Sequence, residues 1–363
     1  MSPLSPNTEI QTGARRTTLN LVAGSLWYAP GSFGIARALS SQYSLRSILF
    51  HDISDTESVF TKGLGVTVRR KQFEAALRFV AKHYTPVSLQ DVLAESDSSP
   101  LPPRPVLLTF DDAYRSVREF AAPLCFELGV PAVFFVNGSC LNNQQLALEN
   151  LLCYVANIRG LKTVNAAIQA VDGAKNLAVG SLLEVFSRFL PATSLQGRQA
   201  FRSALVRLAG IDESKLAPEA GLYLSGEQLR DLAKFKFEIG NHTYSHANCR
   251  ILSPADFAGE IDRNKTLLEE VSATNVRSFS VPYGSSVDFT GALAEHLRRE
   301  GYKAVFLAEG RANSSRIHSS RIHDLALDLT LDRVSIKAGT DAAFFSEIEI
   351  LPRLRSLRSS LAN

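Results

Sequence analysis

Cysteine is scarce in this chain of 363 residues, and the four cysteines at positions 125, 140, 153 and 249 form no Cys-x-x-Cys pair. Without regular spacing they predict neither a disulfide framework nor a cysteine-rich zinc site, so we expect reduced, buried thiols. Lys and Arg form no block interleaved with aromatic residues, and the formal net charge is only +3. We therefore expect no nucleic-acid partner.

Long apolar runs are also missing, and none approaches the length of a membrane span. Arg15 and Arg16 precede an apolar stretch at 19–29, which resembles a twin-arginine export signal, but polar residues and a glycine interrupt that stretch. We expect a cytoplasmic protein or one at the inner membrane, with export as the alternative. A C-terminal helix rich in arginine allows peripheral contact with an anionic membrane, beside the simpler reading of a solvated helix.

Hydrophobic residues make up 45% of the chain, enough for a sizeable core. Short β-branched or aromatic runs alternate with helical patterns, which predicts an α/β fold with a largely parallel sheet. Seven such runs favour a (β/α) barrel. The expected strands cover residues 47–50, 86–89, 106–110, 132–136, 235–239, 279–281 and 304–307.

One stretch, residues 141–223, has helical patterning and little β signal. Because an ordinary strand connection is far shorter, we expect a helical insert within the barrel. The predicted organisation is an N-terminal, partly helical segment at 1–44, a barrel at 45–340 that contains this insert, and a C-terminal helix or tail at 341–363.

The run VLLTFDD at 106–112 is an apolar strand that ends in two adjacent carboxylates, Asp111 and Asp112. Functional groups gather at the carboxyl ends of strands in parallel sheets and barrels. One acid of such a pair can bind a metal while the other moves protons. The alternative is an acidic turn or a helix cap.

The run EIGNHTYSH at 238–246 places His242 and His246 directly after another apolar strand. If a helical turn follows that strand, their spacing puts both imidazoles on one face, where they can share a metal. Two histidines and one carboxylate, Asp112, leave a metal such as zinc with an open coordination position, which is the catalytic pattern. Such a metal supports hydrolysis.

Two further runs, PAVFFV at 131–136 and FSVPYG at 279–284, complete an ordered set with these motifs. The set resembles the polysaccharide deacetylase (NodB-homology) family over residues 47–307, apart from the insert. The resemblance implies a distorted (β/α) barrel of about seven strands that deacetylates N-acetylated, or sometimes O-acetylated, sugars. It also implies a divalent metal ion, with zinc expected and cobalt or nickel as alternatives.

The family's roles carry over to the matching residues. Asp111 matches the general base, and Asp112, His242 and His246 match the metal ligands. Tyr283 matches the residue whose backbone N–H helps to hold the oxyanion. Pro282 and Gly284 match the substrate-binding loop around it.

The sequence departs from the family's fullest pattern at two positions. Ser280 stands where many members have an arginine, so any tuning of Asp111 by a guanidinium is absent or comes from elsewhere. The run LDRVSI at 331–336 lacks the histidine that usually serves as general acid. The run ILFHDI at 48–53 resembles a strand-end element of exopolysaccharide N-deacetylases with permuted motifs, and this makes His51 the candidate acid. The alternative for His51 is a strand-end hydrogen bond without a catalytic role.

These features predict a metal-dependent carbohydrate deacetylase that acts on an N-acetylated glycan or a glycan precursor. Three alternatives remain open. They are a deformylase or deacetylase of a lipid-linked sugar, an O-acetyl esterase, and a catalytically silent glycan-binding homologue.

Overall fold

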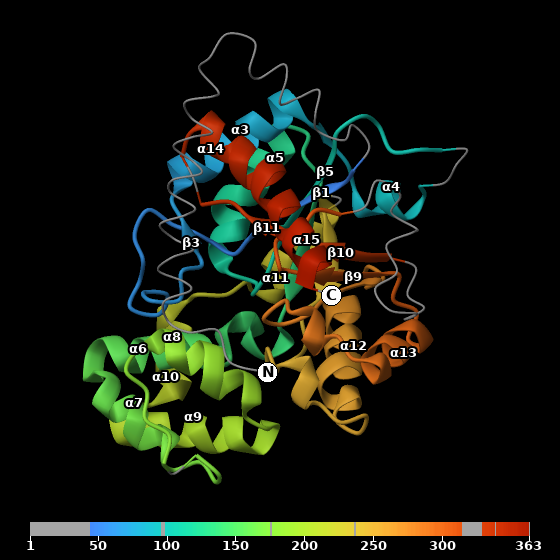
Figure 1. The fold of residues 1–363 in the computed structure, drawn as a ribbon. Coiled ribbons are helices and arrows are strands. Elements are labelled where there is room, and N and C mark those ends of the chain that lie inside the picture. The colour runs from blue at the N-terminus through green and yellow to red at the C-terminus, as the bar shows by residue number, and fades with distance from the viewer. Residues whose placement is uncertain are drawn as a thin grey trace.

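The structure is a computed structural model that describes residues 44–95, 99–174, 176–235, 237–313, 329–337 and 339–362 (Figure 1). The expected N-terminal segment, with its paired arginines, falls outside these residues apart from its last position. The strands are β1 (Arg46–Phe50), β2 (Asp52–Ile53), β3 (Thr67–Val68), β4 (Thr85–Pro86), β5 (Pro105–Phe110), β6 (Ala132–Val136), β7 (Glu238–Asn241), β8 (Ser278–Ser280), β9 (Ala304–Leu307), β10 (Leu329–Asp332) and β11 (Val334–Ser335).

The main sheet is parallel throughout and runs in the order β10-β9-β8-β7-β6-β5-β1-β11, with β4 also paired to β5. Its two end strands, β10 and β11, are neighbours in the sequence and are separated only by Arg333. The segment 329–335 therefore pairs with β9 through its first half and with β1 through its second half. We call this segment the barrel seam, because it closes the sheet into the expected α/β barrel.

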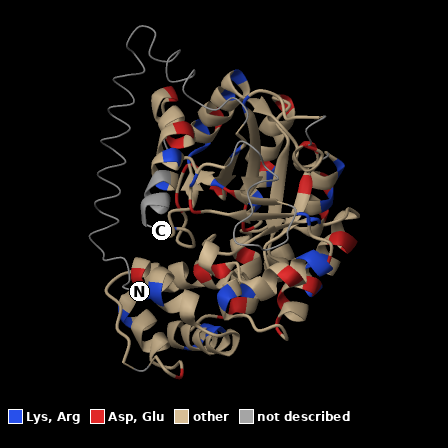
Figure 2. Ribbon diagram, turned by 45° about the vertical axis from the view of Figure 1, so that its right-hand side comes forward, with Lys and Arg blue, Asp and Glu red and all other residues tan. Residues whose placement is uncertain are grey.

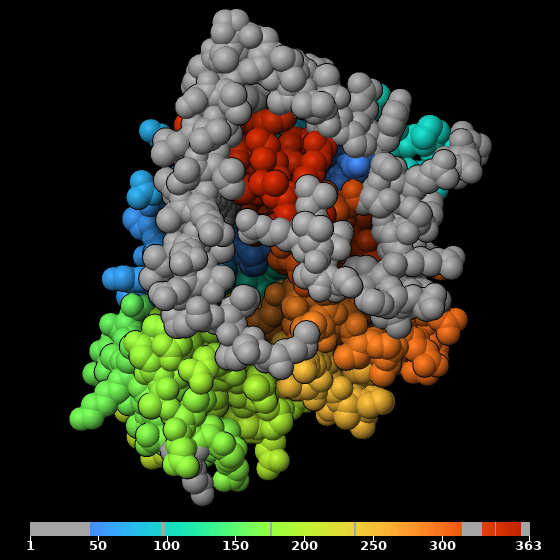
Figure 3. Space-filling view, viewed as in Figure 1, coloured from blue at the N-terminus to red at the C-terminus, as the bar shows by residue number. Residues whose placement is uncertain are grey.

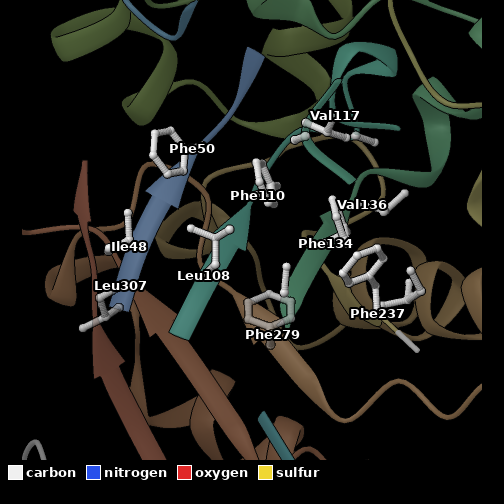
Figure 4. Close-up of a cluster of buried hydrophobic side chains, with 14 of the residues drawn as sticks. Ile48, Phe50, Leu108, Phe110, Val117, Phe134, Val136, Phe237, Phe279 and Leu307 are labelled. Carbon is white, nitrogen blue, oxygen red and sulfur yellow. The ribbon is translucent and has the colours of Figure 1, made fainter. Parts of the chain in front are cut away.

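Alternate residues of the strands build two separate cores, as the twofold periodicity of a strand requires. One set, which includes Phe50, Phe110 and Phe134, packs against the surrounding helices (Figure 4). The other set, which includes Leu107, Phe135 and Phe306, forms a second apolar cluster of strand residues inside the barrel. Both sets are buried, which explains why β6 and β9 are apolar along their whole length.

The outer helices follow from amphipathic sequence patterns. Helix α3 (Arg70–His83) buries Phe73, Leu77 and Val80 on one face. Helix α11 (Gly226–Lys234) begins with a capping box, in which Ser225 and Gln228 exchange backbone and side-chain hydrogen bonds. The other helices and helical turns of the barrel are α4 (Leu89–Leu93), η1 (Val117–Ala121), α5 (Ala122–Glu127), η2 (Gly138–Asn143), η5 (Cys249–Ile251), η6 (Ala258–Asp262), α12 (Arg263–Ser272), η7 (Ser286–Asp288), α13 (Gly291–Arg299), α14 (Asp341–Phe345), η9 (Ser346–Ile350) and α15 (Leu351–Ala362).

Between β6 and β7 the chain leaves the barrel and forms a helical insert, drawn in green in Figures 1 and 3. This insert has a hydrophobic core of its own, which includes Leu151, Val164 and Phe201. Its exit segment is joined to the end of β5 by an antiparallel bridge between Tyr114 and Tyr223. The helices of the insert are α6 (Leu148–Arg159), α7 (Leu161–Ile168), α8 (Leu182–Glu184), η3 (Val185–Phe189), η4 (Leu190–Ala192), α9 (Leu195–Ala209) and α10 (Glu213–Ala220).

The structure corrects some expected strand limits. The strand expected at 235–239 is β7 at 238–241, because α11 continues to Lys234 and Phe235 is the C-cap of that helix. The strand expected at 86–89 is reduced to the two residues of β4, since Ser88 instead caps α4.

The expectation for the cysteines agrees with the structure. The four cysteines are free and buried, as expected. Within the described residues, no helix combines the length and the apolar character needed to cross a membrane. Basic and acidic residues are interspersed along the ribbon of both the barrel and the insert (Figure 2).

A substitution at Gly240 would test the packing inside the barrel. A Cβ at this position of β7 would overlap the ring of its cross-strand neighbour Phe135. We expect Gly240→Ala to lower the free energy of unfolding by about 1–3 kcal/mol, which is typical of overpacking, as measured by urea denaturation. Gly259→Ala is the control, because a Cβ there meets no atom within 4 Å. Equal stability of the two variants would contradict this account.

Candidate active site

The predicted site residues lie where several parallel strands end. His51 follows β1, Asp111 and Asp112 follow β5, and His242 follows β7. Because the strands are parallel, these ends meet at one rim of the barrel. A cavity of about 320 Å³ at this rim is lined by these four residues together with His246, Tyr283 and Gly284. Pro282 is buried and is not among the lining residues, so its contribution is to the shape of the loop.

Asp112, His242 and His246 form a compact triad, with one potential ligand atom from each residue and all three atoms within 4.8 Å of one another. Asp112 Oδ1 lies 3.5 Å from His242 Nε2 and 3.5 Å from His246 Nε2. Ligand atoms that share one tetrahedral zinc ion at its usual bond lengths lie about 3.3 Å apart. The donor set and its spacing therefore fit a divalent metal.

The orientation of both imidazoles supports the same use. His242 Nδ1 lies 2.8 Å from the carbonyl oxygen of Ser280, and His246 Nδ1 lies 3.3 Å from Glu149 Oε1. Each acceptor favours the tautomer with the proton on Nδ1, which leaves the lone pair of Nε2 facing Asp112. Both rings are thus held with Nε2 facing the carboxylate of Asp112.

The two histidines do not share a helical turn, so this part of the sequence prediction was wrong. They lie in a loop in which Thr243 and His246 have φ values of 60° and 56°. The side chains of Asn137 and Asn264 donate to the carbonyl oxygen of Thr243, at 3.1 Å each, and hold the loop. This left-handed backbone brings the imidazoles together in place of helical periodicity.

Asp111 is held by a fully buried arginine from the barrel seam. Arg333 donates from its two terminal nitrogens to the two oxygens of Asp111, at 2.7 and 2.8 Å, and also to Ser280 Oγ at 2.8 Å. Burial alone would raise the pKa of Asp111, but the charges of Arg333 and His242 outweigh it and hold this pKa well below its ordinary value of 3.8. Asp111 is therefore ionised at neutral pH.

Arg333 also resolves the first departure noted in the sequence. The position of the expected arginine is occupied by Ser280, whose hydroxyl donates to Asp111 Oδ2 at 3.1 Å. The guanidinium comes instead from Arg333 of the barrel seam, between β10 and β11. Sequence reasoning missed it, although the alternating apolar residues at 329, 331, 334 and 336 around this arginine were a usable strand signal.

His51 shares the cavity with the acid pair. Burial lowers its pKa from the ordinary value of 6.5, and the carboxylates of Asp112 and Asp111 oppose that shift only in part. The second departure, the missing C-terminal histidine, is thus matched by an imidazole at the same cavity that comes from β1.

Tyr283 has a left-handed backbone, with φ of 63°. Within the described part of the chain its backbone N–H has no hydrogen-bond partner, so it is available to a ligand. Gly284 follows with φ of 70°, and a Cβ there would overlap the backbone of Ala308. Each non-glycine residue in such a conformation costs about 1–3 kcal/mol, a cost that folded proteins typically accept at functional sites.

Two charged residues of the insert also reach the site, and the sequence analysis missed both. Glu149 and Arg198 are buried and form an ion pair of 3.2 Å. Glu149 Oε1 accepts a hydrogen bond of 2.6 Å from the hydroxyl of Tyr283. Their signal in the sequence was weak, because each looks like an ordinary polar residue of an amphipathic helix.

An all-parallel α/β barrel with an acid pair and a histidine pair at one rim is typical of metal-dependent hydrolases. Residues 193–305, which contain both histidines and the Tyr283 loop, match the family model described as polysaccharide deacetylase. The resemblance to this family is thereby confirmed. No curated protein matches the chain in sequence.

One solved deacetylase structure, that of PplD, shares the fold, and two other solved structures are less similar. The Streptococcus pyogenes deacetylase PplD is 14% identical, with 85% of this chain and 100% of that chain covered and a TM-score of 0.53. IcaB from Ammonifex degensii is 18% identical, with 83% and 97% covered and a TM-score of 0.49. A de-N-acetylase from Aggregatibacter actinomycetemcomitans is 14% identical, with 82% and 96% covered and a TM-score of 0.48. At these identities the likeness concerns the fold.

The Arg333–Asp111 pair makes a prediction about stability. Arg333→Met leaves a buried carboxylate without its cation, and we expect it to lower the free energy of unfolding by about 3–5 kcal/mol at pH 7. The same substitution in an Asp111→Asn background leaves no uncompensated charge, so its cost should be much smaller. Urea denaturation of the four proteins measures both costs.

The loss caused by Arg333→Met should also shrink as the pH falls. Without the guanidinium, burial raises the pKa of Asp111, so the folded variant takes up a proton more readily than the unfolded chain does. Equal cost of Arg333→Met in both backgrounds and at every pH would contradict this account.

Proposed function

We propose that the protein is a metal-dependent hydrolase that removes acetyl groups from N-acetylated sugars of a polysaccharide or glycan precursor. The observation that carries the proposal is the triad of Asp112, His242 and His246, whose donor atoms converge beside an ionised Asp111 in a cavity. The match to the polysaccharide deacetylase model supports the choice of substrate class.

The metal in this proposal is zinc. Two imidazoles and one carboxylate form the three-ligand set of catalytic zinc sites, and the same donors also accept cobalt or nickel. When bound, such an ion polarises the acetyl carbonyl and acidifies a water molecule.

The chain's own residues supply the proton transfers. Asp111 removes a proton from the attacking water, whose oxygen forms a bond to the acetyl carbon. The free N–H of Tyr283 donates a hydrogen bond to the oxygen that becomes negative. His51 then protonates the sugar nitrogen as the carbon–nitrogen bond breaks, and acetate and a free amine leave. Arg333 weakens Asp111 as a base but keeps it ionised and fixed in orientation.

The cavity suits one sugar unit that carries an acyl group. Its wall includes Leu64 and Val66 from the loop after β2 and Leu183 and Phe186 from the insert. An apolar wall of this kind can contact the acetyl methyl group and the apolar face of a sugar ring.

The catalytically silent alternative loses its main support. It was based on the absent arginine and the absent C-terminal histidine, but a guanidinium from Arg333 of the barrel seam and an imidazole from His51, after β1, line the same cavity. A lipid-linked sugar and an O-acetyl ester remain outcomes that the assay below distinguishes.

The proposed deacetylase activity should depend on a bound metal. We expect the zinc-, cobalt- or nickel-loaded protein to release acetate from N-acetylglucosamine oligomers or a cell-surface glycan, to lose this activity with EDTA, and to regain it with metal. Release of formate, or turnover of ester but not amide substrates, would favour the alternative hydrolases. Normal metal binding with no release of acetate would refute the proposal.

His51, as the proposed general acid, should determine one limb of the pH dependence of kcat/KM. The base must be ionised and the acid protonated, so kcat/KM should be bell-shaped in pH. The low pKa of Asp111 places the rising limb below pH 3.8, and the lowered pKa of His51 places the falling limb below that of an exposed histidine.

His51→Asn should lower kcat/KM by about 10²–10⁴-fold and abolish the falling limb, as measured by acetate release across pH. His83→Asn, on the outer helix α3, is the matched control and should change neither kcat/KM nor the falling limb of the pH profile. A falling limb that persists in His51→Asn would show that another group donates the proton.

A further inference from the structure

Glu149 stands at the start of α6, in the insert, yet its carboxylate reaches a residue of the metal triad. Its Oε1 lies 3.3 Å from His246 Nδ1, on the side of the ring opposite to the atom that faces Asp112. The same oxygen accepts hydrogen bonds from the hydroxyl of Tyr283, at 2.6 Å, and from Arg198, at 3.2 Å. One buried oxygen therefore contacts three side chains at the site.

Arg198, in α9, connects the same residues a second time. It donates to the hydroxyl of Tyr283 at 3.0 Å and to the backbone carbonyl of His246 at 3.2 Å. The rings of His246 and Tyr283 also pack together, with centroids 5.1 Å apart. We call Glu149, Arg198, Tyr283 and His246 the insert cluster.

The insert cluster is poorly explained as a device for stability alone. The second oxygen of Glu149, Oε2, is buried and has no hydrogen-bond partner among the described residues. A buried carboxylate that is only partly satisfied stabilises a fold poorly. The cluster also holds two residues, His246 and Tyr283, whose backbones are left-handed.

We propose that Glu149 is a positioning residue of the metal site. Its carboxylate accepts the Nδ1 proton of His246, fixes the tautomer that offers Nε2 to the metal, and makes this imidazole a stronger donor. Through the hydroxyl of Tyr283 it also fixes the loop that carries the proposed oxyanion donor. The inference rests on the metal triad proposed above, and it makes the helical insert part of the metal site.

The two histidines of the triad are supported differently. His242 donates to a backbone carbonyl, that of Ser280, which the barrel itself provides. His246 depends on a charged acceptor from the insert. Loss of that acceptor should therefore affect one ligand and leave the other in place, so the site is weakened and not abolished.

The chain contains a second buried glutamate with an arginine and a tyrosine as partners, which provides a control for Glu149. Glu349 is buried, pairs with Arg46 at 2.9 Å, and accepts a hydrogen bond of 3.1 Å from the hydroxyl of Tyr84. It thus reproduces the Arg–Glu–Tyr arrangement, but Arg46 opens β1, whereas the site follows the carboxyl end of that strand. Glu349→Gln disturbs an equivalent ion pair without touching the site.

The experiment is a titration of the metal-free full-length protein with Co²⁺, followed by its visible absorption and by competition with a chelator. We expect Glu149→Gln to raise the Kd for Co²⁺ by about 10–100-fold and to shift the visible bands. Glu349→Gln should bind Co²⁺ as the wild type does. Thermal unfolding without metal shows how far each substitution destabilises the chain.

Several outcomes would overturn the proposal. Wild-type affinity and an unchanged spectrum in Glu149→Gln would do so, as would equal weakening in Glu349→Gln, which would indicate general destabilisation. If the wild type itself binds no Co²⁺, the proposed metal triad fails and this inference falls with it. Binding by the wild type and equally by Glu149→Gln would refute only the role of Glu149.

A second pair of variants covers the case in which Glu149→Gln does not fold. Tyr283→Phe removes only the hydroxyl that joins Glu149 and Arg198, and Tyr84→Phe removes the corresponding hydroxyl at Glu349. We expect Tyr283→Phe to alter the Co²⁺ spectrum and to raise the Kd, with no change in Tyr84→Phe. The absence of any difference between these two variants would overturn the proposal.

Discussion

The pairing of Arg333 with Asp111 joins the closure of the barrel to the chemistry of its rim. Arg333 is the single residue between β10 and β11, where the chain passes from one edge of the sheet to the other. Its Nε donates to the carbonyl oxygen of Leu307 at 2.9 Å, while its terminal nitrogens hold Asp111 and Ser280. The side chain that bridges the seam thus also keeps the proposed base ionised. Neither carboxylate nor guanidinium could be buried at this depth without the other.

The barrel and the insert divide the construction of the site. Strand ends of the barrel carry the acid pair, the histidines and the Tyr283 loop, which is the usual consequence of a parallel arrangement. The insert adds an apolar wall to the cavity and the charged contacts that Glu149 and Arg198 make with His246 and Tyr283. An antiparallel bridge between Tyr114 and Tyr223 attaches the exit of the insert directly beside Asp112. Glu149, near the start of the insert, contacts His246, and Tyr223, at its exit, bridges Tyr114, so both ends of the insert are connected to the site.

Left-handed residues gather at this rim. Asp112, Thr243, His246 and Tyr283 all have positive φ, although none is a glycine. Such residues persist only where surrounding contacts determine them, and the asparagines behind Thr243 and the insert cluster provide those contacts. The geometry of the donor atoms is thus held by polar contacts made outside the triad itself.

The sequence by itself determined the barrel class, most of the strands, and the acid and histidine pairs at strand ends. Each of these depends on local patterns: apolar runs, helical periodicity and polar residues where a strand stops. The limits of β7 were missed because the phenylalanines at 235 and 237 fit the end of a helix as well as the start of a strand. Local patterns do not distinguish these two cases.

Only the tertiary structure decided what surrounds the acid and histidine pairs. Arg333 lies 222 residues from Asp111 along the chain, and Arg198 is 49 residues from Glu149. No periodicity links such partners, because their approach depends on how the barrel closes and how the insert folds back. The loop that brings His242 and His246 together could not be predicted from local patterns either. Hydrogen bonds from distant asparagines hold this loop in a conformation other than the helical turn that the spacing of the two histidines suggested. Residue types at strand ends are a local property, whereas the charges and hydrogen bonds that orient them are produced by the whole fold.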